Sequence, residues 1–311
     1  MASSADLLAA VGLPGADLDR LPASSIRFPD GAEYRIEIPS VEGPACLEAA
    51  LEEAERLDVP VHRFSQGSGV GMLTEVELAD MAATARRERR EVSLFARPCA
   101  AWGASASARA PQGAAVAPVS RGMGDLAAAL DEIQHAANHG FRSVLIADIG
   151  LLAAFSELRA AGHLPPDMQA KVSAMLPVAN AATARVIARL GANTINLVTD
   201  LTLPMIAAVR AVTSLPLDVY IEAPDGLGGF VRQTELARLI QVAAPVYVKF
   251  GLRNAPDIYP SGRHLETTAV AMTRERVRRA RLALDLLARS STSPAVSDIG
   301  IGDLAIPVGA S

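Results

Sequence analysis

Residues 171–222 read KVSAMLPVANAATARVIARLGANTINLVTDLTLPMIAAVRAVTSLPLDVYIE, and this stretch decides the fold. It contains three runs rich in apolar and β-branched residues: Lys171–Leu176, Thr194–Thr199 and Leu217–Glu222. Such runs are typical of buried strands, and the residues between them have helical character. Strand, helix, strand, helix, strand is the pattern of parallel strands joined by crossover helices.

Working outward from this stretch, the same pattern continues in both directions. Five more strand-like runs occur: Tyr34–Ser40, Val61–Gln66, Val92–Arg97, Ser143–Asp148 and Val246–Gly251. Helix starts are well marked, with a capping box at Thr74–Glu77 and capping residues at Asn180 and at Asp200 or Thr202. Strand then helix, repeated eight times, predicts a single-domain (β/α)8 TIM barrel.

The length of 311 residues suits one such barrel with extensions. We expect an N-terminal extension over residues 1–32, the barrel over residues 33–290 and a C-terminal tail over residues 291–311. The segment 98–124, between the third and fourth strands, is rich in Ala, Gly, Pro and Ser and contains the only tryptophan, Trp102. It is either a lid over the catalytic rim or a surface insertion.

Composition excludes several classes of protein. The formal net charge of −5 does not attract nucleic acid or anionic membranes. The first 28 residues carry Asp6, Asp17 and Asp19 and no positive leader, unlike a signal peptide, and no apolar run reaches the roughly eighteen residues that span a bilayer. We therefore expect a cytoplasmic protein that acts on a small molecule.

Cysteine content limits the chemistry further. The chain has two cysteines, Cys46 and Cys99, too few for a four-thiolate zinc or iron–sulfur site. A disulfide is not expected in an intracellular protein. Cys99 follows the third strand and is either a nucleophile near the rim or a plain buried thiol.

Charged side chains near the strand ends are the candidate catalytic groups. In a barrel strand alternate side chains point inward, so we expect Glu37 and Glu222 to face the axis together with Asp148 and Lys249. Glu222 and Lys249 lie on neighbouring strands and are predicted to pair. One carboxylate would act as general base while a cation steadies negative charge. Lys249 could instead form a Schiff base, although an adjacent Glu222 argues against a neutral lysine.

A second set of residues is expected to bind substrate. These residues lie on strands or in the loops that follow them, above all in the long polar connection after the eighth strand. They are His62, Gln66, Arg97, Lys171, Asn196, Arg253, Asn254, Tyr259 and His264.

Metal binding is only weakly signalled. Glu37, His62, Asp148 and Glu222 could form an oxygen-rich site for a divalent ion, although no His-x-His or His-Glu-x-x-His spacing is present. The remaining histidines that fall on helices or at helix ends, His135, His139 and His163, are expected to be inert.

The order of motifs from the fifth to the seventh strand resembles the collagenase-like peptidase family U32. The residues that carry the resemblance are Lys171–Asn180, the Leu190–Asn196 turn into the sixth strand, and Leu217–Glu222. The resemblance extends over about residues 33–255 and implies a TIM barrel with Glu222 as the strand-end carboxylate. Family members commonly have cysteines after the seventh strand, some of which hold an iron–sulfur cluster. This chain has Ala223-Pro-Asp-Gly there, so we expect no such cluster.

These observations leave three functions open. The first is an enzyme that uses acid/base chemistry on a small polar or peptide-like metabolite, with the resemblance implying a hydrolase. The second is a carbon–carbon or carbon–nitrogen lyase that uses Lys249. The third is a non-catalytic barrel subunit, either in a homo-oligomer or in a complex with a partner subunit.

Overall fold

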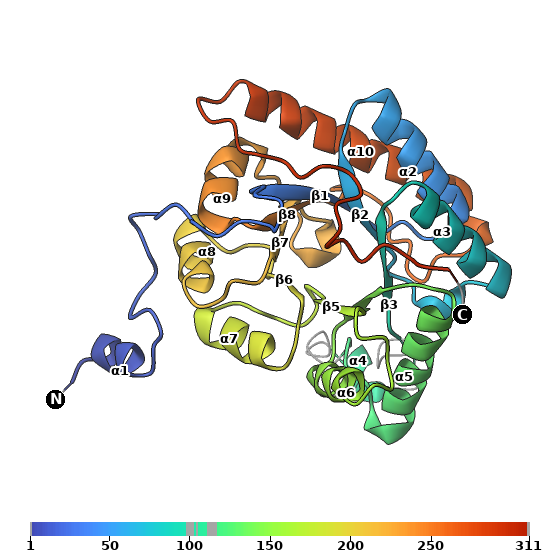
Figure 1. The fold of residues 1–311 in the computed structure, drawn as a ribbon, viewed down its shortest axis with the longest axis horizontal. Helices are drawn as coiled ribbons and strands as arrows, with labels where there is room; N and C mark the ends of the chain where they lie inside the picture. Colours follow the sequence, from blue (N-terminus) through green and yellow to red (C-terminus); the bar gives the residue numbers. More distant parts are fainter. Residues whose placement is uncertain (1, 98–102, 104, 111–116, 310–311) are drawn as a thin grey trace.

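Eight parallel strands close into a barrel surrounded by helices (Figure 1). The computed structural model describes residues 2–97, 103, 105–110 and 117–309. The strands pair in chain order, and β8 returns to pair with β1. They are β1 (Tyr34–Pro39), β2 (Val61–Ser65), β3 (Glu91–Phe95), β4 (Ser143–Ile146), β5 (Gln169–Val172), β6 (Thr194–Asn196), β7 (Leu217–Glu222) and β8 (Val246–Phe250). The predicted (β/α)8 fold is confirmed.

Helices follow the strands around the outside of the barrel. The α-helices are α1 (Ser4–Ala10), α2 (Pro44–Arg56), α3 (Glu75–Arg87), α4 (Ala106–Arg109), α5 (Gly122–Asn138), α6 (Ile149–Ala160), α7 (Ala181–Arg189), α8 (Leu203–Arg210), α9 (Leu236–Ala243) and α10 (Glu266–Ala288). Short 3-10 turns are η1 (Val70–Met72), η3 (Asp225–Leu227), η4 (Gln233–Glu235) and η5 (Arg263–Leu265). Within the described residues, no helix combines the length and the apolar character that crossing a bilayer requires.

Three predicted helix starts are confirmed by their capping hydrogen bonds. The hydroxyl of Thr74 accepts from the backbone N–H of Glu77, whose carboxylate in turn accepts from the N–H of Thr74. Asn180 caps α7, and Thr202, rather than Asp200, caps α8. Each cap pairs a backbone donor that the first helical turn would otherwise leave unsatisfied.

The main core lies between the outer face of the strands and the inner faces of the helices. Ile36 and Ile38 of β1 point into it, as the strand pattern predicts, and pack with Leu47 of α2 and Leu78 of α3 in one cluster. Because the apolar side of each strand is used here, the alternate side chains of the same strands face the barrel axis. On β1 these inward residues are Arg35 and Glu37, so the axis of the barrel is polar.

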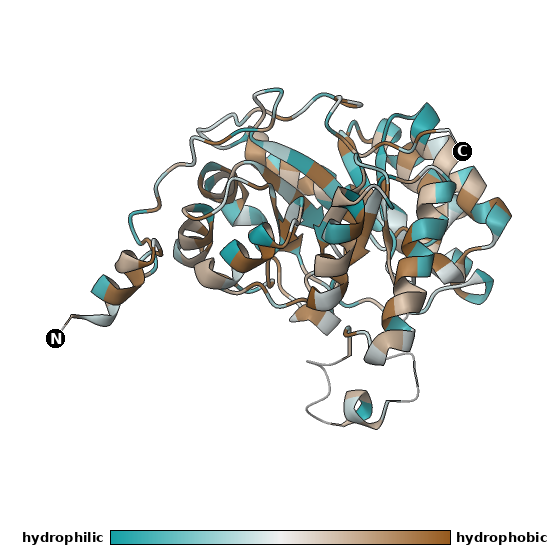
Figure 2. Ribbon diagram, turned by 60° about the horizontal axis from the view of Figure 1, so that its bottom comes forward, coloured by the Kyte–Doolittle hydropathy of each residue, from teal (hydrophilic) through white to brown (hydrophobic). Residues whose placement is uncertain are grey.

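Both chain ends approach the N-terminal ends of the strands. Phe28, Ala32 and Leu304 form a small cluster with Tyr247, and Val296 forms a bridge with Tyr34. Farther out, α1 lies away from the barrel at the end of an extended segment, and none of its residues is buried (Figures 1 and 2). The terminal segments therefore cover the end of the barrel opposite to the usual catalytic rim.

The connection between β3 and β4 is described only in part. Cys99 and Trp102 lie outside the described residues, as does much of the segment expected to form a lid. Cys46 is buried in α2, where burial raises the pKa of its thiol.

Candidate functional site

A network of buried charges fills the barrel axis, and Glu37 lies at its centre. One carboxylate oxygen, Oε2, accepts from Arg63 Nε at 2.8 Å and from Arg63 NH2 at 2.6 Å. The other, Oε1, lies 2.6 Å from Lys171 Nζ and 3.3 Å from Lys249 Nζ, and also accepts from the hydroxyl of Ser65. Glu37 is fully buried, and so are Arg63, Lys171 and Lys249. One carboxylate therefore pairs with three cations in the absence of bulk water.

Two further carboxylates balance these cations. Asp218 Oδ1 lies 2.5 Å from Arg63 NH2, and Asp218 Oδ2 lies 3.3 Å from Lys171 Nζ. Glu91 Oε1 lies 3.7 Å from Arg63 NH1 and accepts from Ser143 Oγ at 2.8 Å. Because removing a charge from water is costly unless it is paired, each member of the network depends on the others.

The network decides which groups are charged. Burial disfavours the Glu37 carboxylate, but the positive charges of Arg63, Lys171 and Lys249 outweigh burial and hold the pKa of Glu37 well below its usual range. Burial lowers the pKa of Lys171 to about 8, and the charge of Lys249 adds to this against the attraction of Glu37. Glu37 is therefore a permanent anion near neutral pH and a poor proton acceptor.

Above the network, a cavity of about 420 Å³ opens at the carboxyl ends of the strands. This volume falls in the usual range of small-molecule sites. Polar residues from seven of the eight strands or strand ends line it, together with apolar side chains such as Phe95 and Met175. The polar lining residues include Ser65, Ser173, Asn196, Tyr220 and Lys249.

Lys249 connects the network to the cavity. Its Nζ lies 3.3 Å from Glu37 and 4.3 Å from the centre of the Tyr220 ring. With its amide oxygen turned toward β8, Asn196 accepts from Lys249 Nζ at 2.8 Å. Glu37, Arg63 and Lys171 do not line the cavity, whereas Lys249 does. The ammonium group is thus the member of the network through which a bound molecule would meet positive charge.

The predicted pairing of Glu222 with Lys249 is wrong. The pairing of β7 with β8 shifts register between Tyr220 and Glu222, so Tyr220 lies opposite Lys249 but Glu222 lies opposite Phe250, which belongs to the outer core. Glu222 accordingly points away from the axis. Its carboxylate accepts from the backbone of Arg253 at 2.9 Å and lies 3.8 Å from Arg279 Nε on α10.

Asp148 does not face the cavity either. Its Oδ1 accepts from the backbone N–H of Leu151 at 2.7 Å as the N-cap of α6, and its Oδ2 accepts from that of Ser120 at 3.1 Å. Asp148 therefore caps the helix that follows β4 and binds the backbone of the connection that precedes α5.

His62 lies at the opposite end of the barrel from the cavity. Its Nδ1 accepts from the backbone of Ile36 at 3.1 Å, and its Nε2 donates to the carbonyl of Ser297 in the C-terminal tail at 2.8 Å. Burial lowers the pKa of His62 to about 4. It does not line the cavity, and Glu37, His62, Asp148 and Glu222 do not converge on one metal site.

Three of the expected substrate-binding residues line the cavity beside Asn196. Arg97 stacks over the Phe95 ring at 4.4 Å and donates from Nε to the carbonyl of Gly67 at 3.1 Å. Gln66 uses its amide to bind the backbone of Gly69 in both directions. Tyr259 bonds through its hydroxyl to Ser40.

The other loop residues contribute less directly. Arg253 lies 3.3 Å from Asp225, and the backbone of Asn254 donates to the same carboxylate at 2.5 Å, so these residues brace the loop after β8 against the loop after β7. Asp225 lines the cavity, whereas Arg253 and Asn254 do not. His264 is exposed in η5 and lines neither described cavity.

Several residues of the site were not predicted as site residues. Arg63, Ser65 and Asp218 carry the network, and Ser173 and Tyr220 line the cavity. One signal was present in the sequence, because Lys171 and Lys249 are its only lysines among 29 basic residues. The other 27 basic residues are all arginine, and both lysines lie at the barrel axis.

Comparison with known proteins finds one family. The model of peptidase family U32 matches residues 120–223, and the resemblance inferred from the motifs is confirmed over that segment. No curated protein matches the sequence.

Solved structures with a similar chain path include three enzymes. The U32 peptidase Mk0906 is 18% identical, with 62% of this chain and 70% of that chain covered and a TM-score of 0.39. A truncated 3-deoxy-D-arabino-heptulosonate 7-phosphate synthase from Thermotoga maritima is 16% identical, with 95% and 100% covered and a TM-score of 0.40. 3-Hexulose-6-phosphate synthase is 17% identical, with 80% and 97% covered and a TM-score of 0.41.

Proposed function

We propose that this barrel, similar to peptidase family U32 over residues 120–223, is an enzyme that acts on a small anionic compound bound against Lys249. The observation that carries the proposal is the ammonium group of Lys249 at the base of a 420 Å³ cavity at the carboxyl ends of the strands. This is the end at which TIM barrels place their chemistry.

The favoured reaction is cleavage of a carbon–carbon or carbon–nitrogen bond next to a carbonyl group. Neutral Lys249 would attack the carbonyl carbon, form a C=N bond and release water. The protonated imine then accepts the electron pair of the bond that breaks, and hydrolysis returns the lysine. Asn196 supports this assignment because its amide holds Nζ in place from the cavity side.

The charge around Lys249 also supports a role for its amine. Lys171 Nζ and Lys249 Nζ lie 2.6 and 3.3 Å from the same oxygen of Glu37, so this oxygen is shared between two lysine side chains. The expected Glu222 partner lies elsewhere, and the carboxylate beside Lys249 is that of Glu37, which also pairs with Arg63 and Lys171. Glu37 lies below the cavity and stays ionised. Proton transfers would therefore use groups that face the cavity.

Borohydride trapping tests the proposal directly. The protein is incubated with a panel of 2-oxo acids, reduced and digested, and the modified peptide is identified by mass. With two lysines in the chain, the result assigns the site without ambiguity. We expect an adduct on Lys249, its loss in Lys249→Arg, and its retention in Glu222→Gln. Absence of any adduct, or one on Lys171 alone, would reject the Schiff-base reaction.

A second candidate is hydrolysis of a peptide-like compound, which the family match over residues 120–223 favours. The carboxylates expected as general base, Asp148 and Glu222, bind backbone N–H groups instead. Ser65 and Ser173 are serine hydroxyl groups that line the cavity. Release of amines from a peptide mixture by wild-type protein, abolished in Ser173→Ala but unchanged in Lys249→Arg, would favour hydrolysis over the lysine reaction.

A third candidate is a barrel subunit that requires a second chain, either another copy or a different protein. Co-expression with neighbouring gene products, followed by the trapping assay, distinguishes it. Activity that appears only in the complex would make this chain a subunit in a cytoplasmic assembly.

A further inference from the structure

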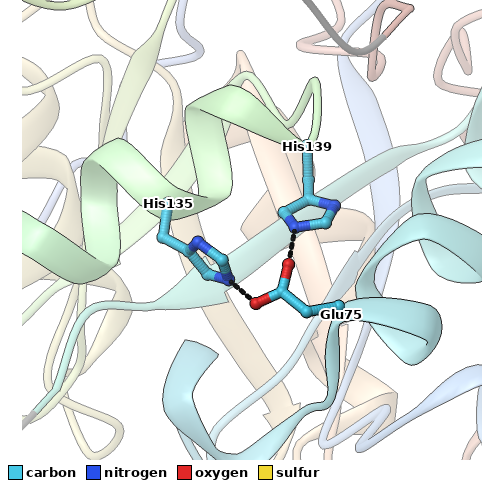
Figure 3. Close-up of side chains that lie close together, drawn as sticks. All are labelled: Glu75, His135 and His139. Atoms are coloured by element: carbon cyan, nitrogen blue, oxygen red, sulfur yellow. Dashed lines mark hydrogen bonds and ion pairs between the residues drawn. The ribbon is translucent and has the colours of Figure 1, made fainter.

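Three potential metal ligands meet outside the barrel, between the start of α3 and the end of α5 (Figure 3). His135 Nε2 lies 3.1 Å from Glu75 Oε1, and His139 Nε2 lies 2.8 Å from Glu75 Oε2. One ligand atom from each residue falls within 4.8 Å of those from the other two. None of these three residues lines the cavity that contains Lys249.

The two helices hold the ligands in place. His135 lies in the last turn of α5 and His139 follows four positions later as the C-cap, so both lie on one side of the end of the helix, with their rings 4.9 Å apart. Glu75 is the first residue of α3, directly after the capping residue Thr74, which fixes where the helix begins. A histidine pair at this spacing on a helix, with a carboxylate opposite, is a common metal-binding arrangement.

The distances match the size of a metal ion. In a tetrahedral site with bonds of about 2.1 Å, ligand atoms are separated by roughly 3.4 Å. The present separations of 2.8 and 3.1 Å run to the two different oxygens of Glu75, and all three ligand atoms lie within 4.8 Å of one another, so small side-chain movements would bring them to these distances. The side chain of Glu75 is 73% exposed, so it is free to make this movement.

We propose that Glu75, His135 and His139 bind a divalent transition-metal ion of the zinc class. Two imidazole nitrogens and one carboxylate oxygen favour zinc over calcium or magnesium, which prefer oxygen ligands. Solvent supplies the fourth ligand, because His135 and Glu75 are both open to water. The ion joins α3 to α5 and so links two helices on either side of β3.

Zinc titration tests the site. Untagged protein, stripped with chelator and dialysed, is titrated with ZnCl2 in a calorimeter, and with CoCl2 while the visible spectrum is recorded. We expect one equivalent of zinc at micromolar affinity, a cobalt spectrum typical of four-coordinate geometry, and a melting temperature that rises with zinc.

Variants separate this site from other ligands on the chain. Glu75→Gln, His135→Ala and His139→Ala should each weaken zinc binding at least tenfold and remove the rise in melting temperature. His163→Ala, which alters an exposed histidine outside the group, should bind as the wild type does. Wild-type affinity weaker than millimolar, or equal affinity in the three ligand variants, would overturn the proposal and leave only two Glu–His hydrogen bonds. The metal-free melting temperature of each variant shows that the fold is intact.

Discussion

Glu37 shows how one residue determines the character of the barrel interior. It neutralises charge on Arg63, Lys171 and Lys249 and is shielded from water by all of them. The sequence predicted that Glu37 faces the axis, because Ile36 and Ile38 alternate with it. The sequence did not predict which cations surround Glu37, because these cations lie on other strands, 26 to 212 positions farther along the chain.

Replacing Glu37 by Gln should destabilise the protein strongly. The substitution keeps the shape but removes the one carboxylate that all three buried cations share, and breaking a buried pair in this way costs about 3–5 kcal/mol. The measurement is the free energy of unfolding in urea. Glu88→Gln, which removes an exposed ion pair with Arg87, is the matched control and should cost less than about 1 kcal/mol. Equal effects of the two substitutions would show that the network contributes no stability.

His62 should make the protein sensitive to acid. Its pKa is about 4 in the folded state and near 6.5 when unfolded, so the unfolded chain binds more protons between these values. Stability is therefore complete above pH 6.5 and decreases as the pH falls toward 4, by about 3 kcal/mol at most. Urea unfolding at pH 7 and pH 4.5 measures the loss. His62→Gln should show a smaller loss than the wild type, whereas His163→Ala should not. An unchanged pH dependence in His62→Gln would contradict this account.

At the scale of elements, the sequence predicted the features that depend on neighbouring residues, namely strands and helix caps. The strand runs and the caps at Thr74, Asn180 and Thr202 were read correctly because each depends on a few neighbouring residues. Glu222 was placed wrongly because strict alternation ignores the register shift in β7. The partner of His62 could not be predicted from neighbouring residues, because Ser297, which it binds, lies 235 residues later.

The C-terminal tail is expected to stabilise the barrel through Arg35. This guanidinium group is buried and lies 2.7 Å from Asp303, with Phe28 stacked 3.9 Å from it. Asp303→Ala should cost about 1–3 kcal/mol, because a buried cation loses its anion. Asp298→Ala, at an exposed position of the same tail, should stay within about 0.5 kcal/mol of wild type. If both variants unfold at the same urea concentration, the tail does not hold the barrel through this contact.

At the scale of the molecule, the two ends of the barrel differ in structure. The terminal segments close the end near Arg35 and Tyr247, and the cavity opens the other. The fold was predictable because eight strand–helix repeats permit few arrangements. The site was predictable only in part, since Lys249 and Asn196 meet in the cavity whereas Asp148 and Glu222 are used by helices and loops.

The rate at which each lysine reacts with formaldehyde and cyanoborohydride tests the central claim most directly. Lys249 faces the cavity, and Lys171 lies in the charge network without lining it. In the folded protein at pH 8 we expect Lys249 to be methylated at least tenfold faster than Lys171, with the two rates converging in urea. Equal rates in the folded state, or faster modification of Lys171, would contradict the assignment of Lys249 as the group that meets the substrate.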